Sequence, residues 1–175
     1  ISRPGAYSVV DTSEMIPLQI GAQKVLGFIG EAPTAPVDTD RTKVLFFNTP
    51  KTARLALGAG ELINHMEDAW KHGADLIAVS IVVGSGTQSA VQDTDWDTAI
   101  GRFETENVNG IIPVTTSGAV LTKIDTHIQT MSNVTQRKER RGFYGHATGL
   151  TADAVATAKT SFSTERAVFA SPGVY

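Results

Sequence analysis

Short apolar runs alternate with stretches of helical periodicity along most of this chain. The six short runs cover residues 25–29, 44–47, 76–83, 111–114, 143–145 and 167–170. Their length and their β-branched and aromatic content are typical of buried strands. The longer stretches place apolar side chains every three or four positions, over residues 62–70, 96–103, 121–131 and 155–162. This alternation predicts an α/β fold with a mostly parallel sheet and helices on both faces.

The ends of several elements carry their own signals. Gly73 stands where the 62–70 helix should end, and Lys71 and His72 beside it complement the negative end of the helix dipole. Thr115 to Ser117 are N-cap candidates for the 121–131 helix. Pro113 lacks a backbone donor, so we expect it near the end of its strand.

The first twenty residues have a different character. Pro4 disfavours helix at Arg3, and the residues that follow include several strand formers with open backbone donors and acceptors. Such a segment can add a strand to the sheet edge of a neighbouring chain. We therefore expect residues 1–20 to form an extended N-terminal arm and residues 21–175 to form the α/β domain. The arm residues predicted to make interface contacts are Arg3, Pro4, Tyr7, Val9 and Val10.

Composition removes several classes of function. The chain has 175 residues, is 41% hydrophobic and carries a net charge of -3, which argues against a general nucleic-acid binder. The absence of cysteine excludes disulfides, thiolate catalysis and cysteine-ligated metals. No apolar run is long enough to span a bilayer, so we expect a soluble protein made in a cytoplasm. The chain starts without Met and stops just after a strand-like run, which is typical of a fragment or a processed product.

An acidic group at the start of the 96–103 stretch resembles a calcium loop. Positions 1, 3, 5 and 12 of an EF-hand-like loop would be Asp93, Asp95, Asp97 and Glu104. However, Thr98 takes the place of the glycine that the sharp turn needs, and the helical period continues through the proposed loop. We therefore favour a helix start, with Thr94 as N-cap and Asp97 three residues later.

Two further candidates for chemistry have weak support. Residues 83–89 follow the strongest strand, where a dinucleotide fold has its phosphate loop, but the third glycine and a phosphate-binding lysine are missing. We interpret this segment as a plain connection. The four histidines are His65, His72, His127 and His146, and no two are spaced as metal ligands on one helix. His127 lies near the apolar side of its helix and is expected to be a core or boundary residue, and no catalytic triad is assigned.

A dense basic run lies between a predicted helix and a predicted strand. Its cationic residues are Arg137, Lys138, Arg140 and Arg141. Such a run is usually a solvated turn. It could also meet the acidic group at Asp93, Asp95 and Asp97 of a neighbouring subunit, where paired charges set register. The sequence leaves both interpretations open.

The order of several motifs resembles one family, the tail sheath proteins of contractile bacteriophages and related contractile injection systems. The stretches that carry the resemblance are residues 3–7, 28–33, 36–39, 62–83 with Trp70-Lys71-His72-Gly73-Ala74, 137–145, 165–169 and 172–175. Together they cover nearly the whole chain. Sheath proteins are usually longer, with a further C-terminal domain and arm, so the resemblance implies a sheath fragment.

The resemblance implies an α/β sheath domain with no catalytic residues, no cofactor and no metal. It implies a structural subunit of the virion tail, assembled in the host bacterial cytoplasm, that polymerises in helical rings around a tail tube and contracts to drive the tube through the host envelope. Its expected partners are other sheath subunits, the tube protein, and the baseplate and tail terminator proteins, without nucleic acid and without membrane insertion.

Two alternatives stay open. One is another structural component of a contractile tail, such as a terminator or baseplate protein. The other is a flavodoxin-like enzyme that binds a nucleotide or a metal, which the loop at Gly84 and the acidic group at Asp93 would serve.

Overall fold

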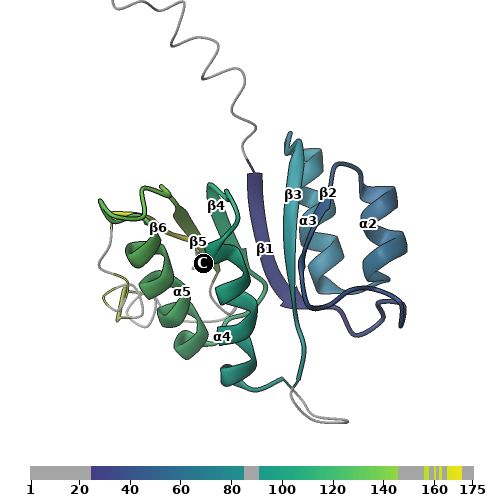
Figure 1. The fold of residues 1–175 in the computed structure, drawn as a ribbon, viewed down its shortest axis with the longest axis horizontal. Helices are drawn as coiled ribbons and strands as arrows, with labels where there is room; N and C mark the ends of the chain where they lie inside the picture. The colour runs from purple at the N-terminus through teal and green to yellow at the C-terminus, as the bar shows by residue number, and fades with distance from the viewer. Residues whose placement is uncertain are drawn as a thin grey trace, which may run out of the picture.

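The protein forms one six-stranded sheet with helices on both sides (Figure 1). The computed structural model describes residues 25–84, 91–145, 156–157, 160, 162 and 165–170. The strands are β1 (Val25–Glu31), β2 (Val44–Phe47), β3 (Leu76–Val82), β4 (Gly110–Pro113), β5 (Arg141–Gly145) and β6 (Ala167–Ala170). All six predicted strands are confirmed, and Pro113 is the last residue of its strand, as expected.

The strand order is β2-β3-β1-β4-β5-β6, and β2 pairs antiparallel with β3 while the other neighbours are parallel. β1 lies inside the sheet. It pairs along its whole length with β3, from Val25 opposite Leu76 to Glu31 opposite Val82, and also with β4. The predicted mostly parallel sheet is therefore confirmed.

The described helices are α2 (Pro50–Leu57), α3 (Glu61–Lys71), α4 (Asp93–Gly101), the short 3-10 helix η1 (Arg102–Glu104) and α5 (Gly118–Met131). α3 ends as the sequence predicted. Gly73 adopts a φ of 90°, its N–H donates to Trp70 O, and Ala74 N–H donates to Ala69 O. These two hydrogen bonds form a Schellman motif, in which backbone N–H groups beyond the helix donate to its last carbonyls.

Sequence analysis missed α2. The helix has eight residues and buries two of them, Ala53 and Leu57, so its apolar stripe is too short to stand out. Its termini do carry signals. Thr49 caps the helix through a hydrogen bond from Thr52 N–H, Pro50 is the first helical residue, and Gly58 follows the end with a φ of 73°. Half of the fourth predicted helix, residues 155–162, falls outside the described residues.

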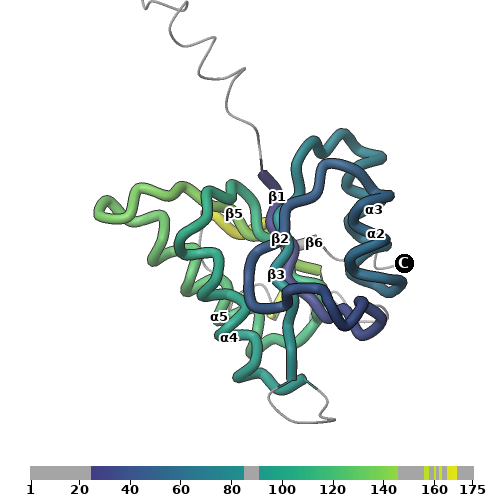
Figure 2. The backbone as a smooth tube through the Cα atoms, turned by 45° about the vertical axis from the view of Figure 1, so that its right-hand side comes forward, coloured from purple at the N-terminus to yellow at the C-terminus, as the bar shows by residue number. Residues whose placement is uncertain are grey.

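Two separate cores hold the layers together. α4 and α5 cover one face of the sheet, and α2 and α3 lie on the other (Figure 2). Helices on both faces are therefore confirmed, although the two faces are covered to different extents. Within the described residues, no helix combines the length and the apolar content that crossing a membrane requires.

Candidate assembly surface

The predicted N-terminal arm precedes the first described residue. Arg3, Pro4, Tyr7, Val9 and Val10 lie outside the described residues, so the boundary between arm and domain stays a prediction. The structure does describe the residue to which the preceding segment attaches. Val25 N–H donates to Asn109 Oδ1 (3.0 Å), and Asn109 N–H donates to Val25 O (2.9 Å). The first residue of β1 is thus held through both its N–H and its C=O.

The sheet has two ends at which a further strand could pair. In the described part of the chain, β2 and β6 are the outermost strands, and each has four residues. The outer backbone donors and acceptors of an edge strand are free to pair with another chain. An added strand from a neighbour therefore has two candidate positions.

The acidic group forms a helix start, and the calcium-loop interpretation is wrong for these residues. Asp95 Oδ2 accepts a hydrogen bond from Gln92 N–H (2.8 Å), and Asp93 is the first residue of α4. The N-cap is Gln92 and not Thr94, because the capping box forms between Gln92 and Asp95. Within the described residues, no group of three or more His, Asp or Glu side chains could hold a metal ion.

The three acidic side chains have different surroundings. Asp95 is buried, whereas Asp93 and Asp97 are exposed. Asp97 pairs with Lys123 of α5 (2.7 Å), and the same lysine donates to the Asp93 carbonyl (2.8 Å). Part of the predicted acidic patch is therefore occupied within the subunit. Its meeting with the basic run of a neighbour stays a prediction.

Most of the basic run lies at the surface. Arg137 is exposed with a φ of 53°, Lys138 donates through Nζ to Glu104 O, and Arg141 is the exposed first residue of β5. These positions fit the solvated turn and leave the interface hypothesis untested.

Arg140 departs from the rest of the run because its side chain is 1% exposed. Its Nη2 donates to Phe103 O (2.6 Å) and Glu106 O (2.7 Å), and its Nη1 donates to His127 Nε2 (2.6 Å). A buried guanidinium needs such acceptors to offset its lost hydration. The solvated turn, one of the two interpretations that the sequence left open, is therefore wrong for Arg140, because its guanidinium joins η1, α5 and the entry to β5.

The predicted location of His127 is confirmed. Its side chain is 9% exposed, and burial together with the Arg140 charge lowers the pKa of His127 to about 4. Because a guanidinium donates and never accepts, Nε2 is the acceptor and the ring is neutral. His65 and His72 are exposed on and beside α3, and His146 lies outside the described residues. Most of the predicted glycine-rich connection, residues 85–89, also lies outside them.

Among the described residues, no helix covers the β5 and β6 half of the sheet on the α2 and α3 side. A row of neighbouring side chains crosses the sheet on this side, and the row consists of Val79, Phe28, Ile112, Phe143 and Val168. The first two are 0% and 1% exposed, Ile112 is half-buried, and the last two are 38% and 46% exposed. We call Ile112, Phe143 and Val168 the open sheet face.

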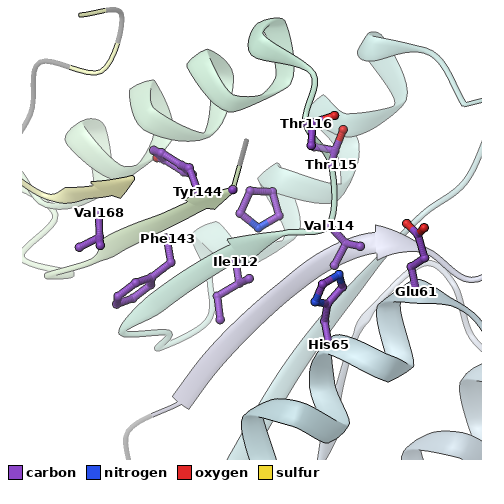
Figure 3. A pocket seen from close by; sticks show the side chains of 11 residues that line it. Glu61, His65, Ile112, Val114, Thr115, Thr116, Phe143, Tyr144 and Val168 are labelled. Carbon is purple, nitrogen blue, oxygen red and sulfur yellow. The ribbon is translucent and has the colours of Figure 1, made fainter. Parts of the chain in front are cut away.

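A depression of ≈ 700 Å³ lies over the open sheet face. Figure 3 shows Glu61 and His65 of α3 as one wall, Thr115 and Thr116 beyond the end of β4, and the apolar side chains of the strands as the floor. A second depression, which contains Arg141 and Arg166, shares Phe143 with the first. The open sheet face is therefore a hollowed apolar surface with a polar rim.

The reverse side of the same strands is closed. Tyr144, adjacent to Phe143 in β5, is 1% exposed, and its ring centroid lies 5.3 Å from that of Phe162. The ring lies over Gly142, where an added Cβ would come within 2.3 Å of the Tyr144 hydroxyl oxygen. Gly142 is thus required by the close approach of this ring.

A second apolar group lies at the opposite end of the sheet. Val37 is completely exposed, Leu55 is 70% exposed and Phe46 is 46% exposed. Phe46 and Leu55 line a depression of ≈ 350 Å³ together with Pro36, Asp38 and Asp40. We call Val37, Phe46 and Leu55 the β2-edge patch. Sequence analysis missed both apolar surfaces. Hydrophobic periodicity shows which side chains of an element are apolar, but it does not show whether another layer covers them.

No family model and no curated protein matches this sequence. The fold does match solved structures. One is the sheath tail protein Lin1278 from Listeria innocua, with a TM-score of 0.54, 10% sequence identity, and coverage of 70% of this chain and 48% of that chain. Another is the helical sheath of the anti-feeding prophage in its contracted state, with a TM-score of 0.56, 8% identity, and coverage of 86% of this chain and 40% of that chain.

The chain therefore has a sheath-like fold, and it spans about half the length or less of the two sheath proteins that it matches. At these identities the likeness concerns the fold alone.

Proposed function

We propose that this chain is a structural subunit of a contractile tail sheath, or of the sheath of a related injection system. The observation that carries the proposal is the match of its fold to two sheath proteins, one of them described as a helical sheath in a contracted state. The order of motifs in the sequence supports the same conclusion independently, because it also resembles that of tail sheath proteins.

In this proposal residues 1–20 are an arm that adds a strand to the sheet of a neighbouring subunit. The exposed edges of β2 and β6 are the candidate receiving strands. Backbone hydrogen bonds tolerate changes of side-chain contacts, so such an arm keeps subunits connected while their globular parts move. Contraction is then a rigid-body rearrangement from a metastable lattice to one of lower free energy.

The remaining partners follow from this role. Subunits assemble in helical rings around a tail tube in the host bacterial cytoplasm, between a baseplate and a terminator, and act in the virion tail without enzymatic turnover. Exposed charges at Asp93 and Asp97 and at Arg137 and Arg141, with the half-buried Lys138 beside them, would meet in one of the two lattices.

Deletion of residues 1–20 tests the arm. The truncated chain should remain a folded monomer and lose the ability to polymerise, because the domain core lies in the described residues. The measurement is negative-stain electron microscopy at rising protein concentration, with circular dichroism to establish folding. A matched control replaces residues 1–20 by a Gly/Ser segment of equal length, which keeps the chain length and removes the strand-forming side chains. Polymers of either variant would contradict the arm assignment.

The same images separate the alternatives. Long helical tubes support a sheath, whereas closed rings support a terminator or baseplate component. A flavodoxin-like enzyme would instead show a higher melting temperature with a nucleotide or metal, because a ligand of the native state stabilises it.

A further inference from the structure

Two buried side chains on the α4 and α5 side of the sheet form a contact that only one protonation state allows. His127 is 9% exposed and Arg140 is 1% exposed, and Arg140 Nη1 lies 2.6 Å from His127 Nε2. A guanidinium can only donate, so Nε2 is the acceptor. A proton on Nε2 would remove this acceptor and place two cations side by side at a buried site. The contact therefore requires a neutral His127.

The other contacts of Arg140 do not compensate a second positive charge. Within the described residues, no carboxylate forms an ion pair with Arg140. Its Nη2 donates to two neutral carbonyls, Phe103 O and Glu106 O, and its Nε is buried without a hydrogen-bond partner. An unsatisfied buried donor destabilises the arrangement that buries it. Loss of the His127 acceptor would therefore leave the guanidinium with two hydrogen bonds to carbonyls.

Other charged or titratable side chains belong to the segments that hold this pair. They are Lys123 and Asp125 of α5, Glu104 of η1, Glu106 after it, Lys138 before β5 and Tyr144 of β5. Lys123 pairs with Asp97, and Asp125 accepts a hydrogen bond from Gln129 (2.7 Å). Burial lowers the pKa of Arg140, and Glu104 opposes this effect. Burial and the Arg140 charge, in turn, lower the pKa of His127. Histidine is the side chain that ordinarily changes its charge in mild acid.

Arg140 is the last residue of the segment that joins α5 to β5, which we call the α5–β5 connection, residues 132–140. This connection folds largely on itself. Lys138 N–H donates to Met131 O (3.0 Å), and Arg140 N–H donates to Ser132 Oγ (3.0 Å). None of its residues belongs to either of the two cores. Both cores can therefore stay packed when the connection moves.

The α5–β5 connection has one buried attachment to the rest of the domain. Lys138 donates to Glu104 O and Glu139 pairs with Arg166, but these bonds lie at the surface, where such contacts contribute little. The Arg140 side chain, in contrast, reaches into the domain and joins the connection to α5 and to η1. Arg140 is therefore the residue on which the position of the connection depends.

We infer that mild acid releases the α5–β5 connection through protonation of His127 while the two cores stay folded. The released form binds the proton more tightly than the closed form, so a falling pH favours release. Release adds the Arg140 charge to the exposed charges of Arg137 and Arg141, and any contact made by the basic run then depends on pH. The inference goes beyond the proposed function and does not depend on it, because it concerns the folded domain alone.

Hydrogen exchange of the full chain at pH 7 and pH 5, corrected for the intrinsic exchange rate and read by mass spectrometry, tests the release. From pH 7 to pH 5 the opening equilibrium of residues 132–140 should rise about twentyfold, since the pKa of His127 is 6.5 when released and about 4 when closed. These amides should also exchange faster than those of β3 at both pH values. Exchange as slow as that of β3 would mean that the connection opens only with the whole domain, and it would overturn the inference.

His127→Gln is the matched variant, because glutamine offers Arg140 an acceptor and does not titrate. Its connection should exchange at the same corrected rate at both pH values, and protection of β3 in the same sample establishes that the domain is folded. Arg137→Gln removes an exposed cation from the same run and should keep the wild-type response. A full pH response in His127→Gln, or none in Arg137→Gln, would contradict the role of His127.

Arg140→Gln tests the attachment from the other side of the contact. This variant removes the cation and shortens the side chain, so the connection should exchange at pH 7 at least as fast as the wild-type connection does at pH 5. Its exchange should then change less than about twofold between the two pH values, because opening no longer depends on the charge of His127. A connection as protected as that of the wild type at pH 7 would show that Arg140 does not hold it.

Discussion

Two adjacent isoleucines in β4 lie on opposite faces of the sheet and have opposite surroundings. Ile111 is 0% exposed and packs in the core formed with α4 and α5, whereas Ile112 is half-buried at the margin of the core formed with α2 and α3. The same contrast occurs in β5 between Tyr144 and Phe143. Side chains alternate across a strand, so both pairs report on the layers above and below the same part of the sheet.

The difference shows that the two faces of the sheet are covered to different extents. The face under α4 and α5 is closed across β1, β4 and β5, and its side chains stabilise the subunit. The other face is closed over β1 and β3 but open over β5 and β6. Parallel sheets usually have both faces covered, so the uncovered half over β5 and β6 departs from the usual arrangement.

Substituting the two isoleucines tests this contrast and should give the largest effect. Ile111→Ala should lower the free energy of unfolding by about 4 kcal/mol, because it leaves a cavity in a closed core. Ile112→Ala removes the same atoms at a partly exposed site and should cost about 1 kcal/mol. Urea denaturation at neutral pH measures both values. Equal costs would mean that the two faces are equally closed.

The second largest effect is expected on acidification, which should lower the free energy of unfolding through His127 on the closed side of the sheet. The pKa of His127 is about 4 in the folded protein, below the ordinary value of 6.5, because burial and the Arg140 charge disfavour the imidazolium. The unfolded chain therefore binds the proton first as the pH falls. Stability should be lost between about pH 6.5 and pH 4, by up to roughly 3 kcal/mol from this residue.

The pH dependence of unfolding of His127→Gln provides the comparison. Glutamine retains an acceptor for Arg140 but does not titrate, so the loss of stability between pH 6.5 and 4 should be smaller by the His127 contribution. An identical slope in the variant and the wild type would assign the pH dependence to other groups.

The smallest effect is expected on the open sheet face. Val168→Thr changes an edge-strand side chain that is 46% exposed, and it should alter the free energy of unfolding by less than about 0.5 kcal/mol. Urea denaturation of the monomer measures it. A cost above about 2 kcal/mol would show that Val168 belongs to a core within its own subunit.

Apart from α2, the order of the described strands and helices could be predicted from the sequence, because local patterns determine it. The six apolar runs, the C-terminal end of α3 at Gly73 and the position of Pro113 all depend on backbone preferences and on burial along one segment. The helix at Asp93 was recognised for the same reason. Its cap was misplaced by two residues, because a glutamine N-cap carries a weaker local signal than a threonine.

The tertiary features could not be read in this way. Arg140 belongs by sequence to a run of surface charges, and its burial depends on carbonyl acceptors from η1 and the residues after it. The open sheet face depends on where α2 and α3 end in space. Neither fact is local, so no periodicity in β5 or in the basic run could reveal it.

The position of β1 determines how the domain would respond to a pulling force. A pull on the chain before Val25 acts along a strand that is flanked by parallel partners on both sides and pinned at its first residue by Asn109. Many ladder hydrogen bonds are then loaded in shear together and cannot be peeled apart one after another. Tension applied at the start of β1 is therefore transmitted to the middle of the sheet, where the hydrogen bonds to β3 and β4 resist it together.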